Sequence, residues 1–168
     1  MSDLLAALKG VMKGEVTDDA AERALMSRDT SLFTLTPTMV VYPQDAEDVS
    51  NLVKTVHAAR EAGAEVSVTG RAAGTDMSGG PLTKSVVAVF TKHMNKFIEV
   101  ERDAVPIESG TSGFAVTEPG VFYRDFEKET LKQNLILPSY PASRELAAMG
   151  GIVANNSGGE RTLEYGKT

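Results

Sequence analysis

The segment that most constrains the fold of this chain has the pattern of a β-strand, an α-helix and a second β-strand. Met39–Tyr42 and Val66–Thr69 are short runs typical of strands, and residues 43–63 between them carry apolar residues at helical spacing. Two strands joined by one helix normally lie parallel, with a right-handed crossover. The sequence therefore predicts a small parallel α/β subdomain from about Met39 to Phe90.

The helix inside this subdomain has recognisable ends. Pro43 opens it, and Asp45 is placed to cap the amides of its first turn. Gly63 follows the last turn and can take the left-handed conformation that ends many helices. The face expected to pack against the strands is formed by residues at i, i+3, i+4 and i+7, which are Val49, Leu52, Val53 and Val56.

Other helices and strands are predicted on both sides of this subdomain. A short helix should begin after Thr17 or Asp18, followed by an irregular connector over residues 28–38. Further strands are expected at Val86–Phe90, Phe97–Val100 and Ala115–Thr117, with a polar turn over residues 108–113. Two amphipathic helix faces complete the pattern: Leu4, Leu5, Leu8, Val11 and Met12 near the amino terminus, and Phe122, Tyr123, Phe126 and Thr130 near the carboxyl terminus. The elements together predict an α+β fold.

Composition excludes several classes of function. The net charge of −6 argues against a nucleic-acid-binding surface. Because the chain has no Cys, redox chemistry needs an organic cofactor. The only two histidines, His57 and His93, are far apart in the sequence and predict neither a metal site nor a Ser-His-Asp set. The chain shows no secretory leader and no apolar run of about 20 residues, so we expect a cytoplasmic protein without a membrane span.

The first candidate binding segment is the Gly-rich loop of residues 70–80, directly after the second strand. Small residues let backbone N–H groups converge on an anion, and the hydroxyls of Thr75 and Ser78 add donors. This pattern is typical of a pyrophosphate-binding loop. A Gly-rich turn between two strands is the alternative, and the segment by itself does not decide between them.

The second candidate segment lies near the carboxyl end, at residues 137–143 and 150–159. Two Gly-Gly steps allow close backbone approach to an extended ligand, while Ser143, Asn155 and Ser157 offer hydrogen bonds. With little periodicity, this stretch is expected either to be disordered or to wrap around a ligand. A Rossmann fingerprint is absent, and the terminal Gly166-Lys167-Thr168 is not a P-loop because Arg161 stands where its first glycine is required.

The order of these motifs resembles the FAD-binding domain of the vanillyl-alcohol oxidase and para-cresol methylhydroxylase family, most closely its glycolate oxidase and D-lactate dehydrogenase branch. The segments that carry the resemblance are residues 36–43, 71–80, 118–120, 137–143, 150–159 and 165–166. The resemblance implies two small α/β subdomains, the second incomplete. It divides the chain into an amino-terminal helical segment, residues 1–35, and an FAD-binding domain, residues 36–168, truncated at its carboxyl end.

The resemblance also implies the cofactor and its binding residues. FAD would be held non-covalently, because the first loop has no histidine to form a flavin bond. The expected pyrophosphate residues are Arg71, Ala72, Ala73, Gly74, Thr75, Asp76 and Ser78. The isoalloxazine, ribityl and pyrophosphate portions would be approached by Pro138, Ser143, Gly150, Gly151, Asn155 and Gly158.

Family members oxidise a hydroxy acid or alcohol by passing a hydride to flavin N5, and their electrons then go to a separate acceptor. The catalytic residues are expected beyond residue 168, so the chain alone should be inactive and bind FAD weakly or not detectably. Two departures from the family pattern are Ala72, where glycine is usual, and Asp76, whose carboxylate would repel a nearby phosphate. Both departures favour one alternative, a cofactor-free regulatory or scaffold domain. A relative of the cell-wall enolpyruvyl-glucosamine reductase is a second alternative, which the segment at residues 137–143 fits less well. No residue pattern specifies the oligomeric state.

Overall fold

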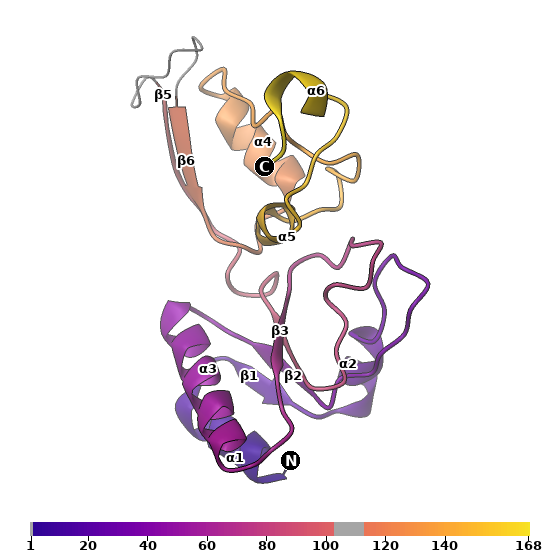
Figure 1. Ribbon diagram of the computed structural model, residues 1–168. Helices are drawn as coiled ribbons and strands as arrows, with labels where there is room; N and C mark the ends of the chain where they lie inside the picture. Colours follow the sequence, from indigo (N-terminus) through magenta and orange to yellow (C-terminus); the bar gives the residue numbers. More distant parts are fainter. Residues whose placement is uncertain (1, 103–112) are drawn as a thin grey trace. The chain divides into compact units, whose positions relative to one another are not determined.

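The structure is a computed structural model that describes residues 2–102 and 113–168 (Figure 1). It divides into two compact units, Met1–Met94 and Asn95–Thr168. Both units combine helices with a small sheet, as the α+β prediction requires.

The first unit is built on a four-stranded sheet with the order β1-β2-β4-β3. Its strands are β1 (Glu15–Thr17), β2 (Met39–Tyr42), β4 (Val86–Val89) and β3 (Val68–Arg71). β2 and β3 both pair parallel with β4, and β1 pairs antiparallel with β2. The predicted parallel arrangement is therefore confirmed, although β4 lies between the two strands that flank the helix. β3 also begins and ends two residues later than predicted, so that Arg71 is its last residue.

Helices cover both faces of this sheet (Figure 1). On one face, α1 (Ser2–Val11) and α3 (Ala46–Glu61) pack Leu8, Leu52 and Val56 against the strands. On the other face lie α2 (Ala20–Leu25) and Met26, which packs against the cluster containing Val40 and Val87. Coverage on both sides explains why every residue of β2 and β4 is buried and why these strands are continuous apolar runs.

The ends of α3 follow the prediction. Asp45 caps the helix by accepting a hydrogen bond from the Asp48 amide at 2.9 Å, and Gly63 has a φ of +93° just beyond its end. The predicted buried face is wrong at Val53, which is 53% exposed, and Val49 is only half-buried. The buried side chains are instead Asp48, Leu52 and Val56, at i, i+4 and i+8, which form a narrower stripe than the predicted one.

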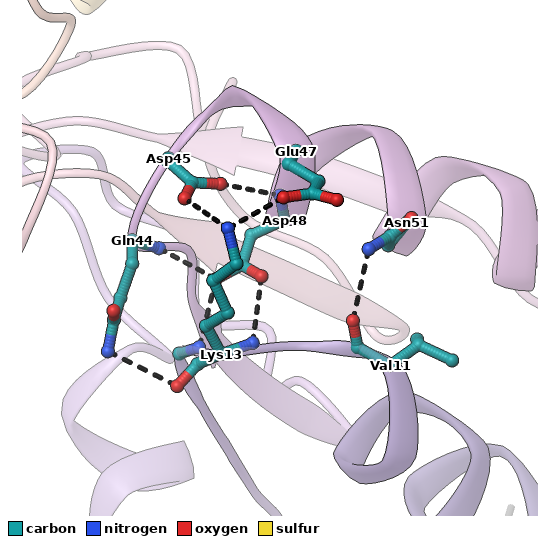
Figure 2. Close-up of polar contacts among 8 residues, drawn as sticks. Val11, Lys13, Gln44, Asp45, Glu47, Asp48 and Asn51 are labelled. Atoms are coloured by element: carbon teal, nitrogen blue, oxygen red, sulfur yellow. Dashed lines mark hydrogen bonds and ion pairs between the residues drawn. The ribbon is translucent and has the colours of Figure 1, made fainter.

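The turn between α1 and β1 is fastened to the start of α3 by the buried side chain of Asp48 (Figure 2). Its carboxylate accepts hydrogen bonds from three backbone N–H groups, those of Lys13 at 2.8 Å, Gly14 at 2.9 Å and Gln44 at 2.9 Å. Above it, the exposed Lys13 ammonium forms ion pairs with Asp45 and Glu47, at 2.9 and 2.6 Å. Asp48 thus joins two segments more than 30 residues apart in the sequence.

In its described residues, the second unit contains three helices and the hairpin of β5 (Phe97–Arg102) and β6 (Gly113–Thr117). The predicted helix is α4 (Tyr123–Leu131), and the predicted face is confirmed at its buried residues Tyr123, Phe126 and Thr130. Phe122, the fourth residue of that face, is the N-cap and is half-buried. The predicted turn at residues 108–113 lies outside the described residues except for Gly113.

The carboxyl-terminal stretch is ordered, and the structure places two helices in it, α5 (Met149–Ala154) and α6 (Thr162–Tyr165). Tyr140, Met149 and Ile152 are buried in the same cluster as Phe126. The sequence did not indicate α5 because its first turn contains Gly150 and Gly151, which are poor helix formers. Tertiary packing overrides that preference.

Candidate cofactor site

The first candidate loop leaves β3 at Arg71 and contains a run of unpaired amides. Within the described part of the chain, the N–H groups of residues 72–75 donate no hydrogen bond. Gly74 has a φ of +72° and Gly79 a φ of +85°, conformations that L-residues rarely adopt. Ala72 does not have a positive φ, so alanine is compatible with this position. Consecutive free amides in a small-residue loop are suited to binding phosphate oxygens.

The Arg71 side chain fixes the base of this loop. Its guanidinium donates to the carbonyl oxygens of Arg28 at 2.7 Å and Met26 at 3.4 Å. Burial lowers the pKa of Arg71, an effect that the nearby Asp29 opposes. A Cβ atom at Gly74 would collide with this guanidinium. Gly74 is therefore required for the fold of the loop itself, whether or not a ligand is bound.

The Asp76 side chain turns back onto the second half of the loop. Its Oδ1 accepts from the Ser78 amide at 3.1 Å and the Ser78 hydroxyl at 3.0 Å, and its Oδ2 accepts from the Gly80 amide at 2.6 Å. Burial raises the pKa of Asp76, but the hydrogen bonds from Ser78 and Gly80 outweigh it, so the pKa lies below its usual value. Asp76 is therefore an ionised, hydrogen-bonded part of the loop.

The connector before β2 supports the same loop. The Thr30 hydroxyl donates to the backbone oxygen of Asp76 at 2.9 Å. The Phe33 ring lies 3.1 Å from where a Cβ atom of Gly79 would be. No sequence pattern predicts these contacts, because residues 28–38 have no periodic pattern and lie about 45 residues away from the loop.

The predicted residues of the second unit follow one another along α5 and its flanking turns. The Ser143 carbonyl accepts from the amides of Leu146 at 2.8 Å and Ala147 at 2.9 Å, which closes the turn before α5. Gly150 and Gly151 lie in the first turn of α5, and Asn155 is its C-cap.

Two glycines of this region allow close packing within the protein itself, without any ligand. A Cβ atom at Gly150 would lie 2.7 Å from the Pro119 Cβ, and the Gly150 amide donates to the Pro119 carbonyl at 2.8 Å. A Cβ atom at Gly159 would collide with the carbonyl oxygen of Tyr140. The Gly-Gly steps therefore serve close backbone packing, which leaves their contact with a cofactor as a prediction.

A pocket of about 660 Å³ lies in the second unit between β6, α4 and α6. Its lining is mixed: Phe114, Phe126 and Leu137 are apolar, whereas Thr130, Arg161 and Glu164 are polar or charged. Pro138 lines it as well, but the other predicted cofactor residues of the second unit do not. The predicted site residues thus form two groups, residues 71–78 in the first unit and residues 138–158 in the second.

The described residues contain no cluster of His, Asp and Glu side chains that could hold a metal ion. None of the helices in residues 2–102 and 113–168 is long and apolar enough to cross a membrane. His93 is paired instead with Glu15, at 2.5 Å between Nε2 and a carboxylate oxygen.

Comparison with known families decides the class of the chain. The family described as FAD binding domain matches residues 37–168. The chain belongs to this FAD-binding domain family. The match includes both candidate segments, and FAD is the cofactor that the family binds.

Relatives of this FAD-binding domain include dehydrogenases and oxidases. The D-2-hydroxyglutarate dehydrogenase of Escherichia coli (strain K12) is 30% identical over 160 residues, covering 92% of this chain and 14% of the relative. The glycolate oxidase subunit GlcD of Bacillus subtilis (strain 168) is 29% identical over 154 residues, covering 90% of this chain and 30% of the relative. The FAD-binding domain therefore spans less than a third of the length of either relative.

Solved structures confirm the predicted fold. The structure of p-cresol methylhydroxylase with substrate bound matches with a TM-score of 0.71 at 16% sequence identity, over 93% of this chain and 29% of that chain. The fold is thus that of the vanillyl-alcohol oxidase and para-cresol methylhydroxylase family, as the resemblance implied.

Proposed function

We propose that this FAD-binding domain serves an FAD-dependent oxidoreductase that oxidises a small hydroxy acid or alcohol. The observation that carries the proposal is the loop after β3, where the N–H groups of residues 72–75 are unpaired and Gly74 has a positive φ. The family match and the names of the relatives, a dehydrogenase and an oxidase subunit, support the reaction class. The proposal extends to a separate electron acceptor and a cytoplasmic location.

Each part of the chain has a defined role in this proposal. The amides of residues 72–75 would bind the diphosphate of FAD, and Arg71 would hold the loop in shape through its bonds to Met26 and Arg28. Six residues of the second unit would approach the flavin and ribityl portions: Pro138, Ser143, Gly150, Gly151, Asn155 and Gly158. When bound, FAD supplies a hydride acceptor at N5. The chain itself supplies binding and orientation.

FAD would be held without a covalent bond. The chain has no Cys, and the first loop has no His, so that loop offers no residue of either type for attachment. Heat or acid should therefore release the flavin into the supernatant.

The test is a titration of the purified protein with FAD, followed by flavin fluorescence, with riboflavin as the matched ligand without a diphosphate. We expect weak, saturable binding of FAD, with riboflavin bound at least about tenfold less tightly because it makes no phosphate contacts. Equal affinity for the two ligands, or no FAD binding at all, would refute the proposal and favour the cofactor-free alternative. Flavin that precipitates with the denatured protein would contradict non-covalent binding.

A further inference from the structure

In the loop after β3, a negatively charged side chain is already bound to backbone amides of the loop itself. The Asp76 carboxylate accepts hydrogen bonds from the amides of Ser78 and Gly80, at 3.1 and 2.6 Å, and both of its oxygens lie 3.0 Å from the Ser78 hydroxyl. Backbone amides arranged in this way are the groups that bind phosphate in small-residue loops. In this chain the second half of the loop is therefore occupied by a side chain.

The first half of the same loop is arranged differently. Within the described residues, the N–H groups of residues 72–75 have no hydrogen-bond partner. The loop thus presents four free amides before Asp76, while two amides after it are used internally. The free amides and the amides that bind the Asp76 carboxylate are therefore different groups of the same loop.

The position of Asp76 is also fixed from outside the loop. The Thr30 hydroxyl donates to the Asp76 carbonyl at 2.9 Å, and Phe33 packs against Gly79. The carboxylate is thus held by charge-assisted hydrogen bonds and the backbone by the connector, which leaves the loop ordered before any ligand arrives. Ordering a loop in advance removes part of the entropic cost of binding.

We propose that Asp76 is a positioning residue. Its carboxylate occupies the amides of Ser78 and Gly80, so that the FAD diphosphate binds the amides of residues 72–75. This inference rests on the proposed function, because it assigns a role in FAD binding. It predicts that Asp76 strengthens FAD binding despite its negative charge. Simple electrostatic repulsion between Asp76 and the diphosphate predicts instead that Asp76 weakens FAD binding.

Three variants test this role. Asp76→Ala removes both acceptor oxygens, and Asp76→Asn keeps one acceptor and removes the charge. Met77→Ala is the control, because it shortens a side chain that is 81% exposed and leaves the bonds from Ser78 and Gly80 to Asp76 in place. FAD affinity and association rate are measured for each, and backbone amide exchange at Ser78 and Gly80 is measured without ligand. Thermal unfolding establishes that each variant is folded.

For Asp76→Ala we expect about a tenfold loss of FAD affinity, carried by slower association, and at least about tenfold faster exchange of the Ser78 and Gly80 amides. Asp76→Asn should lie between Asp76→Ala and the unmodified protein. Met77→Ala should stay within about twofold of the unmodified protein.

Two results would overturn the inference alone: FAD affinity that is unchanged or higher in Asp76→Ala, or amide exchange at Ser78 and Gly80 that is unchanged. An unmodified protein that binds FAD no better than riboflavin would overturn the proposed function, and this inference with it. The titration of the unmodified protein therefore separates the two failures.

Discussion

The buried carboxylate of Asp48 allows a quantitative prediction. In Asp48→Asn the side chain keeps its shape but exchanges one oxygen for an NH₂ group. The carboxamide can turn its oxygen toward Gly14 and Gln44, whose amides share one carboxylate oxygen at 2.9 Å. Its NH₂ group then faces the Lys13 amide, which is also a donor and loses its partner. One buried unsatisfied donor costs about 1–3 kcal/mol, and the two remaining bonds weaken without the charge.

We therefore expect Asp48→Asn to lower the free energy of unfolding by about 2–4 kcal/mol. With a urea m-value of about 2 kcal/mol per molar, the middle of the usual range, the unfolding midpoint should fall by about 1–2 M, measured by circular dichroism. Glu47→Gln is the matched control, because it removes an ion pair to Lys13 from a side chain that is 66% exposed. That change should cost less than about 1 kcal/mol. A midpoint for Asp48→Asn equal to that of Glu47→Gln would show that the buried bonds do not stabilise the fold as argued.

Two further predictions concern the loop and the sheet. Gly74→Ala should lower the free energy of unfolding by about 1–3 kcal/mol in the absence of FAD, because alanine would have to adopt a positive φ and its Cβ would collide with Arg71. An unchanged urea midpoint would contradict this. For Glu15, burial raises the pKa of the carboxyl group, but hydrogen bonds from His93 and Lys92 lower it by a larger amount. The pKa therefore falls from 4.5 to about 2. Its stabilisation should be fully present above pH 4.5 and be lost as the pH falls through about 2. Urea midpoints of Glu15→Gln and the unmodified protein should accordingly differ slightly at pH 7 and converge near pH 2, and a constant difference would contradict the assignment.

The elements that the sequence predicted correctly are those that local patterns determine. β2, β4 and α3 combine apolar periodicity with a cap at Asp45 and a left-handed glycine at Gly63, so each has a signal inside its own residues. The order of the strands was not predictable in this way. β4 inserts between β2 and β3, and nothing within the three strands specifies which pair is adjacent.

The candidate site was predictable in its position but not in its internal contacts. Small residues after β3 located the loop, and the order of the motifs indicated FAD. The Asp-x-Ser spacing at residues 76–78 is a signal for a carboxylate that bonds the amide two residues later, and it could have identified the role of Asp76. The bonds from Arg71 to Met26 and Arg28 had no such signal, because they join segments more than 40 residues apart.

The pairing of β1 with β2 has a consequence for where the folding unit begins. The family match starts at residue 37, yet β1 and α1 precede it and cover residues that the match includes. A polypeptide cut at residue 37 would leave the backbone groups along the outer side of β2 without partners, on a strand of four apolar residues, Met39–Tyr42. Such an open, hydrophobic edge is a template for pairing with other chains. Residues 2–17 thus complete the sheet and cover a strand edge that would otherwise be open to pairing with other chains.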